Sequence, residues 1–528
     1  MKKYLILSCL AGLVFTSCSD QLEITPPNNI IQEQIDELLA SDDEAIKQKV
    51  FAGLASGLPA TFRSAVPGGE SVGRYNDIQG LESMRNLAAN DVVFGAARPN
   101  SWGADEYEVA DLYQSNSPKN YPYWRVGWIN INAANKLLMY LTPEVVGNSA
   151  ILKQYKAMGL TVRAYYYNWL METYQDAYMN GGSGKLGLMW YDEWKPTQPN
   201  KARESATQTY AHIKEDIAEA VQLFSQTIGY TPETSDIDLG VAAFVQARVA
   251  LCAGDWNTVV SASNIILDKT NTLMDESQYV QTPDEEDEWY YAENNAFLNN
   301  AINPEVLLGW DRTISLKTNG AWRNVFISSY GGSNLCWWRI DNRLYEQIDA
   351  NDYRKDNFLA NDFGDYEYPA NGGTYTIPAY SNLKFAAMAR DKAGQDKNTC
   401  NQVDDAYMRL SEVYLMKAEA QEAAGDANGA KATLNTLLAA RSKTGQTLTC
   451  DNYQGAANLS LKQFIQLQWR IEMWGERGIE FYNNKRWNIP VDRTSSANHT
   501  AKPTYPVSLM TLAIPRNEMD YNPLCEQN

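Results

Sequence analysis

Apolar residues recur at helical spacing in several long stretches of the chain. Residues 154–174 place Leu160, Ala164 and Tyr167 on one face, and residues 204–224 form a second stretch that no proline interrupts. A spacing of three or four residues between apolar positions is typical of a helix that buries one face. The pattern therefore predicts a mainly helical protein.

Two further regions each predict a pair of helices joined by the same tight turn, Ala-Gly-Asp. The turn occupies residues 253–255 and again residues 424–426, and at the same offset Ala247 matches Ala418. Glycine can take a positive φ where the first helix ends, and Asp can cap the second helix. This helical hairpin is typical of tetratricopeptide-like repeats. Because the two copies are far apart, a long insertion must leave and re-enter the helical scaffold.

Irregular segments separate the helical regions. Residues 270–400 fit the insertion, since they are rich in Gly, Asn, Asp and aromatic residues around short pieces such as EVLLGW and RLYEQI. Residues 65–125 are expected to be irregular, and prolines exclude long helices from residues 488–528. Residues 461–488 read as a helical stretch with a dense run of charges. We expect the charged side chains of this stretch to satisfy one another between packed helices: Arg470, Glu472, Glu476, Arg477 and Arg486.

The start of the chain predicts a leader and a lipid anchor. Lys2 and Lys3 precede an apolar run that is too short to span a bilayer, as in a secretory signal, and small residues stand directly before Cys18. This arrangement resembles the bacterial lipoprotein box, in which the cysteine is acylated and becomes the new N-terminus; an ordinary signal peptide is the alternative. Residues 1–17 would be the signal and residues 18–30 a flexible leash. Acidic residues after Cys18 resemble the export tags of surface lipoproteins in Bacteroidetes.

Composition excludes some partners and suggests others. The net charge of −19, which becomes more negative once Lys2 and Lys3 are removed, opposes binding to nucleic acid. The chain holds 15 Trp and 32 Tyr, more than cores normally use. Such side chains combine flat apolar area with a polar edge, which suits stacking against a sugar ring. Most of them are nevertheless expected to pack between helices.

Motifs of catalysis are scarce in the sequence. His212 and His499 are the two histidines of the chain, which leaves little for a metal centre or a Ser/His/Asp triad. The glycine-rich run at 181–187 lacks the spacing of a phosphate loop and reads as a turn. Paired carboxylates could hydrolyse a glycosidic bond, but the acidic run at 284–288 is more typical of a solvated loop or a weak calcium site. We expect that the protein is not an enzyme and has no cofactor, and we leave open whether it binds a structural calcium ion.

Five features together resemble the SusD/RagB family of outer-membrane nutrient-binding lipoproteins. They are the lipoprotein leader, RAYYYNWLMETYQDA, DAYMRLSEVYLMKAEAQEAAGD with NTLLAARS after it, RIEMWGERGIEFYNNKRW, and the closing IPRNEMDYNP. Glu480 and Asn483-Asn484 depart from the residues that such proteins often carry ahead of the final Arg-Trp, which puts that local ion-pair network in doubt.

The resemblance implies a fold and a role. About eight helices, paired as four tetratricopeptide-like units, would form one side of a single compact unit, and long loops would form the ligand side. The domain would span residues 31–528, with an N-terminal part at about 31–230 and a second part at about 240–528. Family members sit as lids on a SusC-like TonB-dependent barrel and deliver oligosaccharides, or sometimes peptides, to it. The chain would thus be anchored to the outer membrane at the cell surface and would not catalyse a reaction.

Aromatic residues in the irregular segments, with polar neighbours, are the candidates for ligand contact. We expect the rings to stand together at a solvent-facing rim and the charged side chains to bond sugar hydroxyls. The candidates are Asp77, Arg85, Trp102, Asp105, Trp289, Tyr290 and Trp322. Peptide capture through backbone hydrogen bonds, and a purely structural adaptor, are the competing functions.

Overall fold

The fold is taken from a computed structural model. It describes residues 32–63, 78–94, 106–107, 113–195, 197–227, 229–282, 292–311, 338–368, 373–385 and 404–528. The chain falls into two compact units, one up to Leu54 and one from Ala55 to Asn528. Residues 32–54 belong to the first unit, and all other described residues belong to the second.

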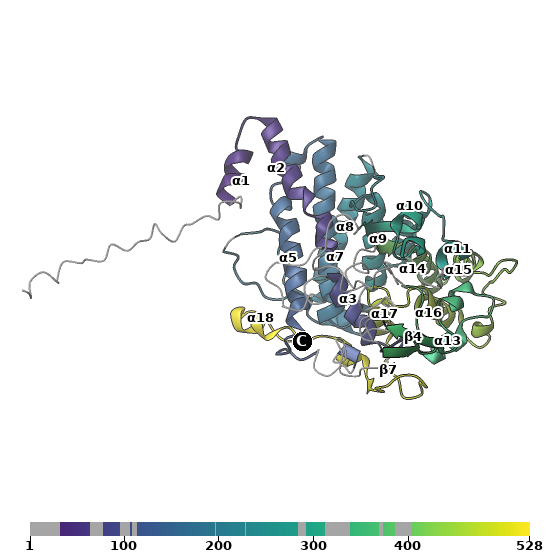
Figure 1. Ribbon diagram of the computed structural model, residues 1–528. Helices are drawn as coiled ribbons and strands as arrows, with labels where there is room; N and C mark the ends of the chain where they lie inside the picture. Colours follow the sequence, from purple (N-terminus) through teal and green to yellow (C-terminus); the bar gives the residue numbers. More distant parts are fainter. Residues whose placement is uncertain are drawn as a thin grey trace, which may run out of the picture. The chain divides into compact units, whose positions relative to one another are not determined.

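Helices make up most of the regular structure in the described residues (Figure 1). The α-helices are α1 Gln32–Leu39, α2 Glu44–Ser56, α3 Ile78–Leu87, α5 Tyr121–Leu138, α6 Pro143–Val146, α7 Ala150–Tyr174, α8 Ala206–Ser225, α9 Leu239–Ala253, α10 Trp256–Leu267, α11 Glu276–Tyr279, α13 Asn342–Gln347, α14 Leu410–Ala423, α15 Ala427–Ala440, α16 Leu461–Glu472, α17 Ile479–Trp487 and α18 Arg516–Tyr521. The mainly helical class is confirmed.

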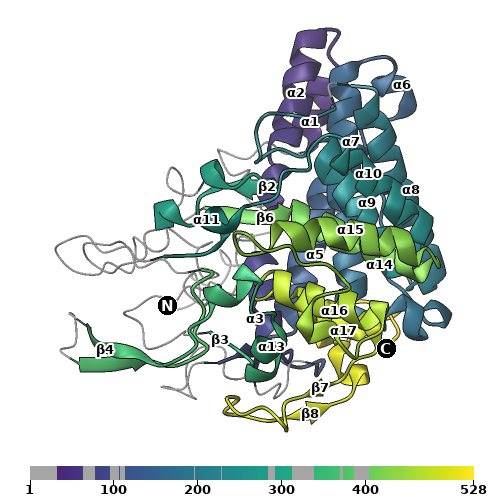
Figure 2. The same ribbon diagram turned by 90° about the vertical axis from the view of Figure 1, so that its right-hand side faces the viewer.

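The long helices form a continuous scaffold. Helices α5, α7, α8, α9, α10 and α14 pack in that order, each against the next, and α15 and α16 both pack on α14 (Figures 1 and 2). Helix α5 approaches α7 closely, because a Cβ at Gly127 would lie 2.5 Å from a methyl carbon of Leu170. Stacked helical pairs of this kind bury a continuous core between neighbours.

The repeated Ala-Gly-Asp turn has the predicted geometry in both copies. Gly254 and Gly425 have φ angles of 73° and 88°, which suit glycine. Asp255 and Asp426 each cap the following helix with a side-chain oxygen that accepts a backbone N–H. The hairpins α9–α10 and α14–α15 therefore confirm the internal repeat.

Strands are few and short, and they form four antiparallel pairs. The pairs are β1 Val92–Val93 with β3 Arg339–Ile340, β2 Val306–Trp310 with β6 Asp405–Arg409, β4 Phe363–Tyr368 with β5 Gly373–Ile377, and β7 Val491–Asp492 with β8 Thr504–Tyr505. In the second pair, Trp310 lies opposite Asp405. This pair closes the loop-rich insertion where the chain re-enters the scaffold at α14.

Three expectations about secondary structure are wrong. Residues 65–125 are not irregular throughout, since α3 and the start of α5 lie in this block. The stretch DAYMRLSEVYLMKAEAQEA before the second Ala-Gly-Asp turn is not helical throughout, since it begins with a buried strand, β6, before α14. The stretch 461–488 is two helices, because Gly475 and Gly478 both take positive φ between α16 and α17.

Candidate ligand-binding face

Most of the predicted ligand-binding residues lie outside the described part of the chain. This holds for Asp77, Trp102, Asp105, Trp289, Tyr290 and Trp322, and also for the predicted lipidation site, Cys18. Their roles stay predictions. The structure does describe the chain on either side of these segments, and thus shows where the segments are attached.

Arg85 is described, and its place differs from the expected one. It lies in α3 rather than in a loop, and its side chain is 1% exposed. The guanidinium carbon lies 4.3 Å from the ring centre of Tyr123 and 4.8 Å from that of Phe481. The buried position does not favour direct contact between Arg85 and a ligand.

The attachment points of two predicted ligand segments are adjacent. The segment with Trp102 follows β1, and the segment with Trp322 precedes β3. These strands pair antiparallel, with Val92 opposite Ile340. One end of each of these two segments is thus attached to the same strand pair.

A buried histidine holds the same anchors together. Tyr107, two residues beyond Asp105, places its hydroxyl 2.5 Å from Nδ1 of His499. The other ring nitrogen of His499 lies 3.1 Å from a carboxylate oxygen of Asp341, which directly follows β3, and 2.8 Å from the carbonyl oxygen of Asn90. Three separate segments therefore meet at His499.

The charges of this contact are set by burial and hydrogen bonds. Burial lowers the pKa of His499 below its ordinary value, although the Asp341 carboxylate opposes this. Burial would raise the pKa of Asp341, but the His499 N–H and the Arg343 guanidinium outweigh it and hold this pKa below its usual range. We infer a neutral imidazole whose Nε2 carries the proton, since both of its neighbours are acceptors.

An ionic network joins the insertion to the helical scaffold. Glu472, at the end of α16, accepts hydrogen bonds from Arg354, Arg409 and Arg441. All four side chains are at most 1% exposed. The remaining members of the network are Asp352, Glu305, Glu476 and Lys384. In the described part of the chain, four cations and four carboxylates of this network balance one another.

The charged residues of 461–488 are paired, but not with one another as expected. Glu472 and Glu476 pair with the network described above. The three arginines find carboxylates in distant segments: Arg470 with Asp91, Arg477 with Glu412, and Arg486 with Glu419. The predicted structural role of these charges is supported, whereas the predicted partners are wrong.

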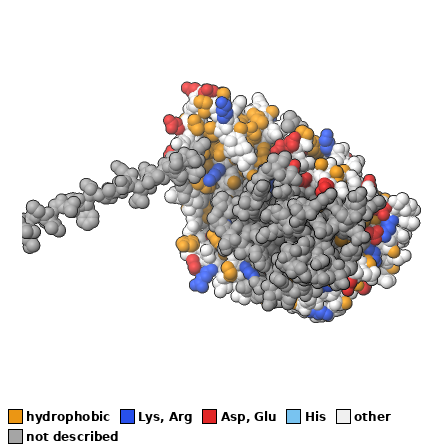
Figure 3. Space-filling view, in the orientation of Figure 1, with side chains coloured by type: hydrophobic (Ala, Val, Ile, Leu, Met, Phe, Trp, Pro, Cys, Tyr) orange, Lys and Arg blue, Asp and Glu red, His pale blue; other side chains and the backbone are white. Residues whose placement is uncertain are grey.

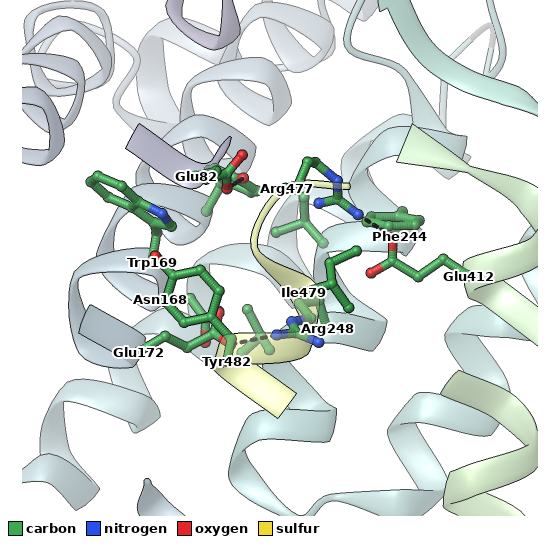
Figure 4. A pocket seen from close by; sticks show the side chains of 13 residues that line it. Glu82, Asn168, Trp169, Glu172, Phe244, Arg248, Glu412, Arg477, Ile479 and Tyr482 are labelled. Atoms are coloured by element: carbon green, nitrogen blue, oxygen red, sulfur yellow. Dashed lines mark hydrogen bonds and ion pairs between the residues drawn. The ribbon is translucent and has the colours of Figure 1, made fainter. Parts of the chain in front are cut away.

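A small polar cavity lies beside α3, between α7, α9 and the segment before α17 (Figure 4). Its volume is about 30 Å³ for the centre of a water-sized sphere, enough for about two water molecules. Two ion pairs line it, Arg248 with Glu172 and Arg477 with Glu412. The third carboxyl group, Glu82, contacts the hydroxyls of Tyr165 and Tyr407.

A larger groove of about 480 Å³ lies on the scaffold beside the repeated turns. Trp256 and Trp487 line it, and both are half-buried. Trp487 donates its indole N–H to Glu419. Since indole rings can stack on sugars, this groove is an alternative place for a ligand, which an experiment must distinguish from the loop segments.

The described residues give no sign of a metal centre or of a membrane helix. No group of three or more His, Cys, Asp or Glu side chains in this part of the chain could hold a metal ion. In the same residues, no helix is long and apolar enough to cross a bilayer. On the face drawn in Figure 3, acidic and basic side chains are interspersed among hydrophobic ones.

A scaffold of stacked helical hairpins, interrupted by a loop-rich insertion, defines a tetratricopeptide-like protein. The model of the SusD family matches residues 217–508, more than half of the chain, and the chain therefore belongs to this family. A second family model, described as starch-binding associating with outer membrane, matches residues 74–251. The sequence matches no curated protein.

Solved structures share the fold at low sequence identity. A SusD-like carbohydrate binding protein from Bacteroides vulgatus is 19% identical, with a TM-score of 0.71 over 90% of this chain and 96% of its own. A SusD superfamily protein from Bacteroides thetaiotaomicron is 19% identical, with a TM-score of 0.68 over 90% and 99% of the two chains. These likenesses confirm the fold over nearly the whole length.

Proposed function

We propose that the protein is a non-catalytic cell-surface lipoprotein that binds oligosaccharides and passes them to a partner TonB-dependent transporter of the outer membrane. Membership of the SusD family carries the proposal. The match to a starch-binding family model and the fold shared with a carbohydrate-binding protein support a saccharide as the ligand. Acylation of Cys18 would supply the membrane anchor.

The geometry supports a binding face formed by the inserted loops. The segment that carries Trp102 follows β1, the segment that carries Trp322 precedes β3, and these two strands pair with each other. Tyr107, two residues beyond Asp105, is fixed by His499. Anchors held by a rigid frame reduce the entropy lost when loops meet a ligand. Stacking on aromatic rings would then supply the affinity, and polar side chains the orientation.

Calorimetry with neutral oligosaccharides, soluble starch and a peptide pool tests the proposal. Replacing Trp102 or Trp322 by Ala should weaken saccharide binding by about 1–3 kcal/mol, the usual cost of removing an aromatic anchor. Thermal stability should stay near that of the wild type. Trp194→Ala serves as a control, because Trp194 is half-buried, lies outside both predicted ligand segments and does not line the groove.

Other outcomes point to other functions. Loss of binding in Trp256→Ala, with Trp102→Ala unchanged, would move the site to the scaffold groove. Affinity for peptides but not for saccharides would favour peptide capture. Glycosidase activity that disappears in carboxylate variants would contradict a binding-only role. If the wild-type protein bound none of these probes, the structural adaptor would be the favoured function.

A further inference from the structure

Three oxygen-bearing side chains form a closed ring of contacts beside the polar cavity. Glu82 comes from α3, Tyr165 from α7 and Tyr407 from β6. The Tyr165 hydroxyl lies 3.2 Å from one carboxyl oxygen of Glu82, and the Tyr407 hydroxyl lies 2.8 Å from the other. The two hydroxyls lie 2.7 Å from each other. All three contacts are within hydrogen-bond distance.

The number of hydrogens on the three side chains decides whether all three contacts can be hydrogen bonds. Each phenol has one hydrogen to donate, and an ionised carboxylate has none. With Glu82 ionised, two hydrogens would serve three contacts, and one pair of oxygens would face each other without a proton. With Glu82 protonated, the carboxyl donates to one phenol, this phenol to the other, and the second phenol back to the carboxyl. The neutral acid therefore satisfies every contact.

The surrounding charges lead to the same protonation state. Glu82 is 3% exposed. The two arginines that line the cavity are each paired with another carboxylate, Arg248 with Glu172 and Arg477 with Glu412. Glu82 thus has no cation of its own at bonding distance among the described residues. An unpaired buried charge is costly, whereas a hydrogen-bonded neutral acid is not.

Several elements present titratable or charged groups to Glu82. Burial has the largest effect and raises the pKa of Glu82 to about 7, although Arg477 and both phenols lower it. Burial likewise raises the pKa values of Tyr165 and Tyr407, so both phenols keep their protons. The groups are Tyr165 and Glu172 from α7, Tyr407 from β6, Arg477 from the segment before α17, Tyr482 from α17 and Tyr123 from α5. On α3 itself, Arg85 follows three residues after Glu82, and its guanidinium lies against the rings of Tyr123 and Phe481.

We propose that Glu82 is a neutral carboxylic acid in the native protein, and that its ring with Tyr165 and Tyr407 makes the junction of α3, α7 and β6 a pH-sensitive element. Loss of the proton breaks one of three hydrogen bonds and leaves a buried negative charge at the junction. Helix α3 lies in the chain between Asp77 and Trp102, two predicted ligand residues. On the proposed function, loosening of α3 therefore weakens saccharide binding.

The sign of the pH effect follows from where the proton is bound. The native state keeps the Glu82 proton to a higher pH than the unfolded chain, whose carboxyl has an ordinary pKa of 4.5. The contribution of Glu82 to stability is therefore complete below pH 4.5 and is lost as the pH rises through about 7. Over this whole window the unfolding equilibrium constant should rise by about 300-fold, which is tenfold per pH unit.

Urea unfolding of the wild type and Glu82→Gln at pH 5 and pH 7.5 tests the proposal. Glutamine keeps the shape and reproduces the neutral acid, since its amide donates to one phenol and its carbonyl accepts from the other. The ratio of the two unfolding constants, wild type over variant, should rise roughly 50-fold between these pH values. Taking the ratio cancels other groups that titrate in both proteins. A ratio that changes by less than about twofold overturns the proposal.

Infrared spectroscopy provides a test that does not need the glutamine variant to fold. At about pH 6, below the pKa of Glu82, the wild type should show the carbonyl band of a protonated carboxyl group that shifts in Tyr407→Phe, because that acid loses a hydrogen-bond partner. A spectrum at this pH without such a band in the wild type, or with a band that does not change in Tyr407→Phe, contradicts a neutral Glu82.

Saccharide affinity measured over the same pH range gives the functional arm. Wild-type binding should weaken from pH 5 to pH 7.5 more than binding by Glu82→Gln. Equal weakening in the two proteins would remove the link between Glu82 and the ligand while leaving the stability result intact. A protein that binds no saccharide, yet shows the predicted ratio of unfolding constants, would refute the proposed function and not the neutral acid.

Discussion

Glu472→Gln is expected to destabilise the protein strongly, because it removes one charge from a balanced buried network. The Glu472 carboxylate accepts hydrogen bonds at 2.9–3.2 Å from three arginines, Arg354, Arg409 and Arg441. With four cations and four carboxylates in the network, glutamine leaves one positive charge uncompensated. It keeps the size of the side chain, so the change tests charge rather than packing.

The expected loss follows from the burial of the network. Removing one partner of a buried ion pair usually costs about 3–5 kcal/mol, since the other charge is left buried without compensation. Burial alone would raise the pKa of Glu472, yet the three arginines hold it well below its ordinary value, so this carboxyl stays ionised at neutral pH. Urea unfolding at pH 7 measures the loss as a lower midpoint.

A surface carboxylate provides the matched control. Glu219 pairs with Lys156, and its side chain is 40% exposed. Glu219→Gln should cost less than about 1 kcal/mol, as is usual for solvent-exposed pairs. If Glu472→Gln lowered the free energy of unfolding no more than this control, the balance of charges in the network would not be what stabilises the fold.

Two further predictions concern backbone strain and pH. Gly478→Ala and Gly425→Ala should each lower the free energy of unfolding by about 1–2 kcal/mol, because a residue with a side chain is strained in the left-handed conformation. Gly478→Ala should lose more, because its Cβ would lie 2.5 Å from the Cβ of Arg85, whereas nothing lies within 4 Å of a Cβ at Gly425. Equal losses in chemical unfolding would contradict the steric argument. His499 is held neutral by burial with its pKa below 6.5, so its contribution is complete above pH 6.5 and is lost as the pH falls. The stability advantage of the wild type over His499→Gln, measured by urea unfolding, should shrink as the pH falls below 6.5, and an advantage that stays constant would contradict a neutral buried imidazole.

Local patterns allowed the scaffold to be predicted. Helices α7 and α8 follow from apolar spacing, and the hairpins around Gly254 and Gly425 follow from a turn whose glycine and aspartate have local roles. Each of these features depends on residues within one or two turns of helix. Such interactions are visible in a sequence because contact in space follows from proximity along the chain.

Helix α3 was missed although its signal is present. Ile78, Leu81, Met84 and Leu87 recur every third residue, which is a helical pattern. The expectation of an irregular block at residues 65–125 passes over this pattern and makes Arg85 a candidate for ligand contact. The helix instead turns Arg85 inward, between the rings of Tyr123 and Phe481.

Ion partners could not be predicted, because they depend on long-range geometry. Arg470 bonds Asp91, almost four hundred residues away, at a site where α16 meets the chain before β1. The sequence shows that Arg470 and Glu472 are close to each other but not that their side chains leave α16 in different directions. Glu472 turns towards Arg409 and Arg441, which come from β6 and the end of α15.

The position of the charged network suggests why it is ionic rather than apolar. It lies where the insertion meets α15 and α16, and hydrogen bonds fix distance and direction there, whereas apolar contacts tolerate sliding. We hypothesise that the network sets the register of the insertion on the scaffold and thereby fixes the anchors of the ligand segments. Glu472→Leu offers apolar packing but no directional hydrogen bonds. It should then lower the midpoint of urea unfolding and also the slope of unfolding free energy against urea concentration, because an insertion packed in the wrong register buries less surface in the native state. An unchanged dependence with a lower midpoint would show that the network adds stability alone.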